Sequence, residues 1–340
     1  MYAVTPRSGC ATFTPLVIGI IGVAYAFDFM NGFHDAANSI TTVVSTRALS
    51  PLAAVGLAAT FNFVAFIVFG FAVAGTIGSG IIALSAINAH VILGALVGAI
   101  SWDIITWFFG LPTSSSHALI GGLIGAGVTE AGTGVLVIAS LSKTLVFLVA
   151  SPLIGLVLAF FLMTLLLRAF RRYSTRLVNG YFKRLQILSS SLVSLSHGSN
   201  DAQKTMGVVT ALLVSTGYLS KFSVPIWVAI MANSAIALGT LFGGWRIVKT
   251  MGFRITKLDP VHGFAAETTA ATVIMTSSLL GIPVSTTHCV SGSIMGVGAT
   301  RRLSAVRWGV ARRIAWAWLI TIPASATVAS LTYLIIMHIG

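Results

Sequence analysis

Two copies of a short polar motif stand inside long apolar segments of this 340-residue chain. Residues 31–38 read NGFHDAAN and residues 197–204 read HGSNDAQK, which places Asp35 and Asp201 at the same motif position. A charge inside an apolar segment is costly, so such a residue usually marks a functional site. An ionised carboxylate only accepts hydrogen bonds, and it can therefore hold a cation or a ligand that keeps a proton.

A second pair of motifs interrupts two other apolar segments. Residues 110–117 read GLPTSSSH and residues 281–288 read GIPVSTTH, at a constant offset of 171. Each motif begins with a turn and continues with hydroxyl residues, which are preferred N-caps of helices. The free N–H groups at such a helix start attract an anion. The candidate ligands from these motifs are Ser114, Ser115, Ser116, Ser285, Thr286 and Thr287.

The elements that carry these motifs are predicted to be membrane helices. Hydrophobic residues make up 56% of the chain and charged residues only 8%. Apolar runs of about 18 or more residues recur along its length. In lipid each segment must pair its own backbone groups, so runs rich in Leu, Ala, Val and Ile form helices. We therefore predict an all-α polytopic membrane protein, in which Cys10 and Cys289 provide neither a disulfide framework nor a metal spacing.

The two kinds of motif recur in the same order in each half of the chain, which indicates an internal duplication. We predict a first inverted repeat at residues 1–168, a basic cytoplasmic linker at 169–184 and a second inverted repeat at 185–340. We expect a broken helix at each aspartate motif and an interrupted hairpin at each hydroxyl motif. Counting the pieces separately gives about twelve helical segments.

The net charge of +13 comes mainly from connections between apolar segments. Of the 20 basic residues, 15 fall in residues 168–184, 246–257 and 301–313. Such clusters follow the positive-inside rule, which explains the charge without nucleic acid and makes binding of anionic lipid headgroups a secondary expectation. If all three clusters lie in the cytoplasm, the two halves of the chain must cross the membrane in opposite orientations. This placement also puts both termini outside a multi-pass protein of the plasma membrane.

Inverted repeats with interruptions at matching positions are typical of secondary transporters that bind substrate near the bilayer midplane. The motif carboxylates would repel sulfate, which has no proton at neutral pH, whereas phosphate keeps an O–H that a carboxylate accepts. The sequence contains no nucleotide-binding motif. An intramembrane hydrolase is disfavoured because the adjacent Ser116 and His117 point to different faces of a helix. A channel is disfavoured because the sequence shows no charged ring and no selectivity-filter loop. With the hydrolase and the channel both disfavoured, we expect a transporter and not an enzyme.

Taken together, the four motifs resemble the signatures of the inorganic phosphate transporter (PiT) family, in particular of the bacterial low-affinity phosphate permeases. This resemblance implies about twelve transmembrane segments in two inverted halves, and symport of phosphate with protons or sodium ions. It also implies that the motif residues hold the phosphate. Carried over position by position, the substrate-binding residues are Asp35, Asn38, Ser114, Ser115, Ser116, Asn200, Asp201, Ser285, Thr286 and Thr287.

Two departures from the family pattern bear on the coupling ion. His34 precedes the first aspartate, and Lys204 stands where the first copy has Asn38. Lys204 is one helical turn from Asp201, so its ammonium could fill the electrostatic place of a sodium ion. The resemblance also gives Glu267 a coupling role. The expected coupling residues are therefore Asp35, Asp201, Lys204 and Glu267.

These departures favour import of inorganic phosphate with protons. The resemblance to bacterial proton-coupled members implies that the phosphate is carried alone or as a neutral complex with a divalent metal. A sodium-coupled phosphate symporter, or a permease for sulfate or another oxyanion, is the alternative. We expect no cofactor and no resident metal, because the spacing of His34 and His197 fits no standard ligand pattern. Membrane lipid is an expected partner, and the sequence leaves open whether the chain is a monomer or a homodimer.

Overall fold

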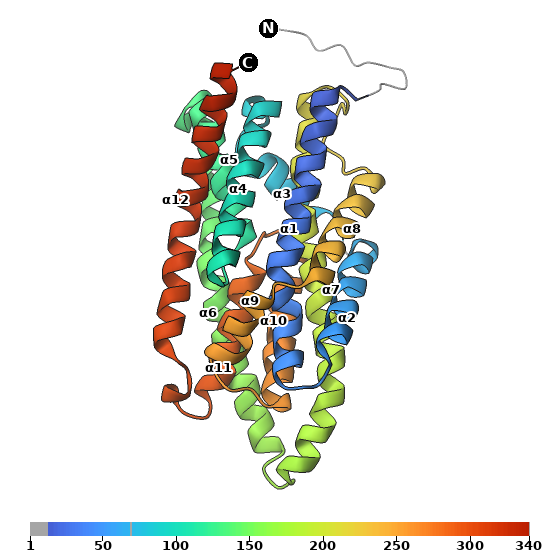
Figure 1. Ribbon diagram of the computed structural model, residues 1–340, viewed down its shortest axis with the longest axis vertical. Coiled ribbons are helices and arrows are strands. Elements are labelled where there is room, and N and C mark those ends of the chain that lie inside the picture. Colours follow the sequence, from blue (N-terminus) through green and yellow to red (C-terminus); the bar gives the residue numbers. More distant parts are fainter. Residues whose placement is uncertain (1–12, 69, 340) are drawn as a thin grey trace.

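The computed structural model describes residues 13–68 and 70–339, and this part of the chain is an all-helical bundle without named strands (Figure 1). The fold class predicted from the sequence is confirmed. The helices are α1 (Pro15–Ser45), α2 (Pro51–Val68), α3 (Ala72–Gly80), α4 (Ala89–Phe109), α5 (Ser115–Ala131), α6 (Ile138–Ala169), α7 (Thr175–Ser215), α8 (Ile226–Phe242), α9 (Trp245–Lys249), α10 (Pro260–Leu279), α11 (Thr286–Ala299) and α12 (Trp308–Ile339).

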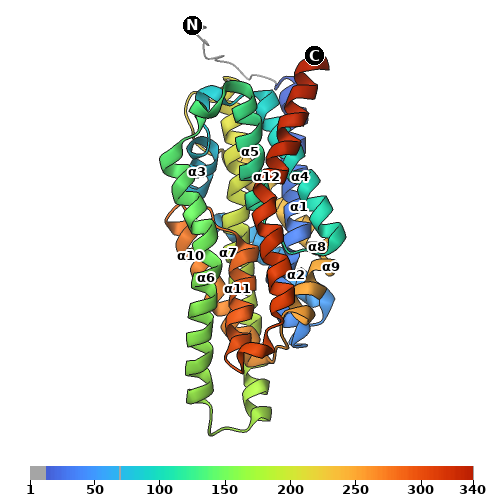
Figure 2. The same ribbon diagram turned by 90° about the vertical axis from the view of Figure 1, so that its left-hand side faces the viewer.

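Several of these helices are long and apolar enough to cross a membrane. Five meet this condition singly, namely α1, α2, α4, α6 and α12, and a sixth span forms if α8 is joined to the segment beginning at α9 across a bend of 59°. The helices α6 and α12 run along the outside of the bundle (Figure 2). Large apolar side chains on them face outward, such as Val149 and Leu319, each 66% exposed. Outward apolar side chains are what a lipid environment requires, and the chain is an integral multi-pass membrane protein.

Two helical hairpins enter the bundle from opposite ends. The α4–α5 hairpin lies in the half that holds the last turns of α12, and the α10–α11 hairpin lies in the other half (Figure 1). Gly110 ends α4 with φ 63°, and Gly281 follows α10 with φ 67°. Glycine takes this left-handed conformation without a steric penalty and closes a helix end. The hydroxyl motifs therefore form tight turns from which α5 and α11 begin.

The prediction that the helices break at the aspartate motifs is wrong. Both α1 and α7 are continuous through these motifs. The motif glycines allow close packing instead: a Cβ added to Gly32 would lie 2.1 Å from the Ile236 carbonyl oxygen, and one added to Gly198 would lie 2.6 Å from that of Asn62. The glycine in each motif thus brings α1 against α8, and α7 against α2.

The basic segment at 169–184 is mostly helical. Helix α6 ends at Ala169 and α7 begins at Thr175, so only residues 170–174 connect them. Ser174 caps α7, because its hydroxyl accepts the Leu177 N–H at 3.4 Å. Arg176, Lys183 and Arg184 therefore belong to the first turns of α7 and not to an extended linker.

The apolar core consists of two clusters, one around each hairpin. On α1 the residues from Val17 to Phe27 join the cluster around α4 and α5, and those from Ala37 to Val43 join the cluster around α10 and α11. On α7 the order is reversed, with Val193 in the cluster around α10 and α11 and Ala202 in the cluster around α4 and α5. The aspartate motifs lie at this division. The fold thus holds a polar layer between two apolar cores.

Candidate functional site

The polar layer collects the residues expected to bind substrate. Helices α1 and α7 contribute their motifs at mid-length, and the starts of α5 and α11 contribute their hydroxyl residues. All of these side chains are at most 3% exposed: Asp35, Asn38, Ser114, Ser115, Ser116, Asn200, Asp201, Lys204, Ser285, Thr286 and Thr287. So many buried polar groups in one layer need partners or a ligand.

Lys204 makes the central contacts of this layer. Its Nζ forms an ion pair with Asp201 Oδ1 and donates a hydrogen bond to the Ser116 hydroxyl. The Val284 carbonyl oxygen, on the turn before α11, accepts from the same ammonium at 3.3 Å. One side chain of α7 thus joins both hairpins. Lys204 does not extend toward a membrane surface, and at 1% exposure its charge is compensated inside the protein.

A second chain of hydrogen bonds connects α1 to the same carboxylate. Asn38 Nδ2 donates to the hydroxyls of Thr286 at 3.2 Å and Thr287 at 3.0 Å. The Thr286 hydroxyl donates to Asp201 Oδ2 at 3.1 Å. Asp201 therefore receives contacts from α7 and α11 together, and Asn38 extends the network to α1.

Of the remaining hydroxyl groups at the two turns, two cap a helix and one has no such role. Ser114 Oγ accepts the His117 N–H at 3.3 Å, and Ser285 Oγ accepts the His288 N–H at 3.2 Å. These two serines are N-caps. The Ser115 hydroxyl is buried beside the Asp103 carboxylate and makes no hydrogen bond of good geometry in the described residues, so it could turn to a ligand.

Two histidines stand beside the motif aspartates. His34 Nδ1 lies 2.7 Å from Asp35 Oδ1, and His197 Nε2 lies 3.2 Å from Asp201 Oδ2. Ligand atoms of Asp35, His197 and Asp201 lie within 4.8 Å of one another, close enough to hold one cation. The sequence spacing does not reveal this group, because its members come from two helices that meet in space.

Glu267 of α10 occupies a separate polar group beside the central network. It accepts hydrogen bonds from the hydroxyls of Thr42 and Ser189, and from Gln186 Nε2 at 3.0 Å. Thr42 lies one helical turn beyond Asn38 on α1. Glu267 is thus one turn away from the network that contains the motif aspartates.

Asn200 is hydrogen-bonded to the second hairpin and not to the other predicted ligands. Its Nδ2 donates to the Ser278 hydroxyl on α10 at 2.9 Å. Its Oδ1 is buried without a partner among the described residues. The described structure thus gives Asn200 a contact with the second hairpin and no hydrogen bond to Asp201 or Lys204.

The structure also reveals a buried carboxylate that sequence reasoning missed. Asp28 lies on α1, two turns before Asp35, and is 0% exposed. Its carboxylate lies beside the side chains of Thr205 and Asn31, and that of Asp103 on α4 lies beside Ser115, without a hydrogen bond of good geometry in the described residues. The available signal was a lone acidic residue in an apolar run, without a match in the second repeat.

A protein-family model for the phosphate transporter family matches residues 31–329, which include all four motifs. The chain belongs to this family. A probable low-affinity inorganic phosphate transporter of Rhizobium meliloti is 56% identical over 320 residues, covering 94% of this chain and 96% of the relative. A protein of the same description from Bacillus subtilis is 44% identical, covering 94% and 97%. These findings confirm the resemblance based on the four motifs.

The fold is also shared with a solved structure, described as the sodium-dependent phosphate transporter. The TM-score is 0.88 at 26% sequence identity, and the match covers 96% of this chain and 100% of the solved chain. The family model and these relatives are all described as phosphate transporters.

Proposed function

We propose that this protein imports inorganic phosphate together with protons by alternating access. We propose protons as the coupling ion because Lys204 and Asp201 form an ion pair in the polar layer. A sodium site needs a carboxylate that is free to coordinate the ion. Here the Lys204 ammonium neutralises the Asp201 carboxylate, so that only the Asp35 carboxylate of the two motifs is left to coordinate a metal cation.

The proposed phosphate site lies between the starts of α5 and α11. Both helix starts supply N–H groups and positive dipole ends, and Lys204 adds a full positive charge. Dihydrogen phosphate can also donate its O–H to Asp35, which sulfate cannot do. We assign substrate contact to Asp35, Asn38, Ser114, Ser115, Ser116, Asn200, Asp201, Ser285, Thr286 and Thr287, with Ser114 and Ser285 acting through the turns that they cap.

Proton coupling is assigned to the carboxylates Asp35, Asp201 and Glu267, with Lys204 as the fixed charge. Glu267 joins α10 to α1 through Thr42 and to α7 through Ser189. Gain or loss of a proton there would change how the second hairpin is held against the two long helices. We propose that the hairpins open the site alternately toward the two sides of the plasma membrane, with both termini outside.

The deciding experiment is phosphate uptake into liposomes that contain the purified protein, with pH and sodium gradients imposed independently. Accumulation of phosphate under a pH gradient in sodium-free buffer is expected. We expect Asp35→Asn to abolish accumulation, because an amide cannot take up and release the coupled proton, and its neutral oxygen accepts the phosphate O–H less strongly than a carboxylate does. The conservative control is Glu130→Gln, since Glu130 is exposed and its carboxylate accepts a hydrogen bond from Asn88, outside the polar layer. Uptake driven by sodium alone would overturn the proposal.

The group formed by Asp35, His197 and Asp201 favours a second candidate. Three ligand atoms within 4.8 Å could hold a sodium ion or a divalent metal that travels with phosphate. This candidate predicts that uptake rises with sodium, or with Mg²⁺, at a fixed pH gradient. Phosphate uptake that is unchanged by either ion excludes it, and competition by sulfate in the same assay tests an oxyanion permease.

A further inference from the structure

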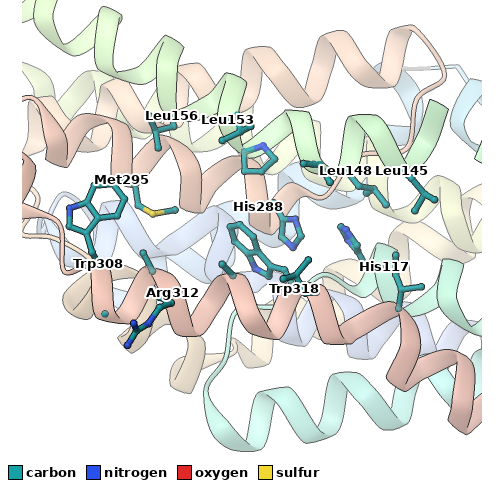
Figure 3. Close-up of a pocket in the computed structure, with 17 residues that line it drawn as sticks. His117, Leu145, Leu148, Leu153, Leu156, His288, Met295, Trp308, Arg312 and Trp318 are labelled. Atoms are coloured by element: carbon teal, nitrogen blue, oxygen red, sulfur yellow. The ribbon is translucent and has the colours of Figure 1, made fainter. Parts of the chain in front are cut away.

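A long groove lies on the outside of the bundle, and its inner end reaches His117 and His288, the last residues of the two hydroxyl motifs. Its volume is about 920 Å³, and it runs between α6 and α12 with α11 beneath it (Figure 3). Most of the lining is aliphatic, including Leu148, Leu153 and Leu156 of α6. Such a lining offers phosphate almost no hydrogen bonds, so the groove is not part of the substrate site.

The packing of the glycines explains why the groove exists. Gly292 and Gly296 bring α11 against the backbone of α6, since a Cβ at either position would lie 2.2 Å from a carbonyl oxygen of α6. Gly121 and Gly125 bring α5 equally close to α12. The outer helix α6 therefore packs on α11, and the outer helix α12 packs on α5. This arrangement leaves a space between α6 and α12.

The groove opens toward the surface that faces lipid. Val149 and Leu319 on its two edges are each 66% exposed. Residues 308–322 of α12 follow its length, which corresponds to about 21 Å at roughly 1.5 Å per residue. One leaflet contributes about 15 Å of hydrocarbon. The groove is thus long enough for a whole acyl chain.

The two ends of the groove differ in charge. Trp308 and Arg312 lie at one end and His117 at the other (Figure 3). Arg312 is exposed and takes part in no ion pair within the described structure, where Asp259 pairs with Arg301 instead. The first turn of α12, with its positive dipole end, lies there too. Tryptophan beside arginine is typical of the membrane interface, where headgroups begin.

We propose that this groove binds an anionic phospholipid, with its acyl chain between α6 and α12 and its phosphate at Arg312. Arginine binds phosphate oxygens with two parallel hydrogen bonds, and an anionic headgroup complements the uncompensated positive end. The positive-inside pattern places this end at the cytoplasmic leaflet, where anionic lipids are common.

The bound chain would reach the place where the two hairpins meet. At the far end His117 of α5 and His288 of α11 have ring centroids 4.5 Å apart. Trp318 stacks on His288 at 3.8 Å and donates to the Pro112 carbonyl oxygen at 2.9 Å. A lipid seated on Trp318 therefore contacts the residues that connect both hairpins to α12.

Quenching of tryptophan fluorescence by brominated acyl chains tests the site. The full-length protein is placed in phosphatidylcholine vesicles containing a small fraction of brominated phosphatidylglycerol, or the same fraction of brominated phosphatidylcholine. The Trp318 contribution is the difference between wild type and Trp318→Phe. We expect Trp318 to be quenched more strongly by the anionic lipid, with a preference of roughly fivefold from one arginine.

Two variants separate the headgroup from the chain. Arg312→Gln should abolish the preference for the anionic lipid, whereas Arg313→Gln, the neighbouring arginine that does not line the groove, should retain it. Ala315→Phe fills the groove and should reduce quenching by both lipids. Native mass spectrometry of wild type and Arg312→Gln, which needs no tryptophan variant, should show loss of a retained anionic lipid.

Equal quenching by the two lipids, or an unchanged preference in Arg312→Gln, would overturn the proposal. Protection of Trp318 from both lipids together with a dimeric mass would show that a second copy covers the groove. That result would also overturn it.

Discussion

At the scale of single residues, the two aspartate motifs differ in the contacts that their last residues make. Asn38 and Lys204 occupy the same motif position, yet Asn38 donates to Thr286 and Thr287 while Lys204 pairs with Asp201. One half of the site thus presents an amide, and the other presents a fixed cation. Removal of one partner from a buried ion pair leaves an uncompensated charge, at a cost of about 3–5 kcal/mol.

Replacing Lys204 by asparagine should therefore change the coupling ion. In Lys204→Asn the Asp201 carboxylate loses its ammonium and becomes free to coordinate a cation, as in a motif with asparagine in both halves. We expect phosphate accumulation under a pH gradient to fall at least about tenfold, equivalent to about 1.4 kcal/mol. We also expect sodium to raise the thermal unfolding midpoint of the variant, because a bound ligand stabilises the folded state.

Lys143→Asn is the matched control for this prediction, since Lys143 is exposed on α6. The control should accumulate phosphate as wild type does, and sodium should leave its unfolding midpoint unchanged. The assignment of Lys204 is contradicted if Lys204→Asn keeps proton-driven accumulation, or if its stability does not respond to sodium.

Residue types indicated most of the side chains that gather in the polar layer, but not how they pair. Charged residues in apolar segments are costly, and this cost is enough to identify Asp35, Asp201 and Lys204 from the amino-acid sequence. The contact of Asn200 with Ser278, and the meeting of Asp35 with His197, depend on how separate helices are placed. Sequence spacing carries no information on distances between helices, so these pairings could not be predicted.

At the scale of helices, the glycines have two roles that the sequence does not distinguish. Gly110 and Gly281 each stand two residues before a proline and adopt positive φ, so the predicted turns at the hydroxyl motifs are present. Gly32 and Gly198 lie within continuous helices and serve close packing. A helix interior tolerates glycine at a cost of only about 1 kcal/mol, which tertiary contacts can offset. These tertiary contacts are not visible in the sequence pattern, and they determine the outcome.

Substitution of Gly32 tests this packing role. In Gly32→Ala the new Cβ would lie 2.1 Å from the Ile236 carbonyl oxygen, so α1 and α8 must separate. Overpacking of this kind costs about 1–3 kcal/mol or more, and we expect a lower thermal unfolding midpoint together with reduced phosphate uptake. The measurement is thermal unfolding of the purified protein in detergent.

Gly22→Ala on the same helix is the matched control for Gly32→Ala. A Cβ at Gly22 meets nothing within 4 Å, so this variant should be neutral or more stable by up to about 1 kcal/mol. Equal effects of the two substitutions on the unfolding midpoint would mean that helix propensity, and not contact with α8, governs the stability at Gly32.

At the scale of the whole molecule, the opposed hairpins supply the symmetry that alternating access needs. The motif duplication predicts two matching interruptions, and the structure places their turns at Gly110 and Gly281 against the same polar layer. Ser116 of one hairpin donates to the Val284 carbonyl oxygen of the other at 3.3 Å. The tips of the two hairpins are therefore in direct contact, and opening one side of the site must alter the contacts of the other.

This arrangement predicts reciprocal access to the two tips. Leu111 and Ile282 follow the matching glycines, and both are at least partly buried. In a background that carries Cys10→Ser and Cys289→Ser, we expect Leu111→Cys and Ile282→Cys to react with a membrane-impermeant maleimide from opposite sides. Reversing the phosphate gradient should raise one rate and lower the other by roughly tenfold, because a shift of about 1.4 kcal/mol between two states produces that ratio. Simultaneous labelling of both positions at undiminished rates would indicate a site open to both sides, as in a channel, and would contradict alternating access even if phosphate still crosses the membrane.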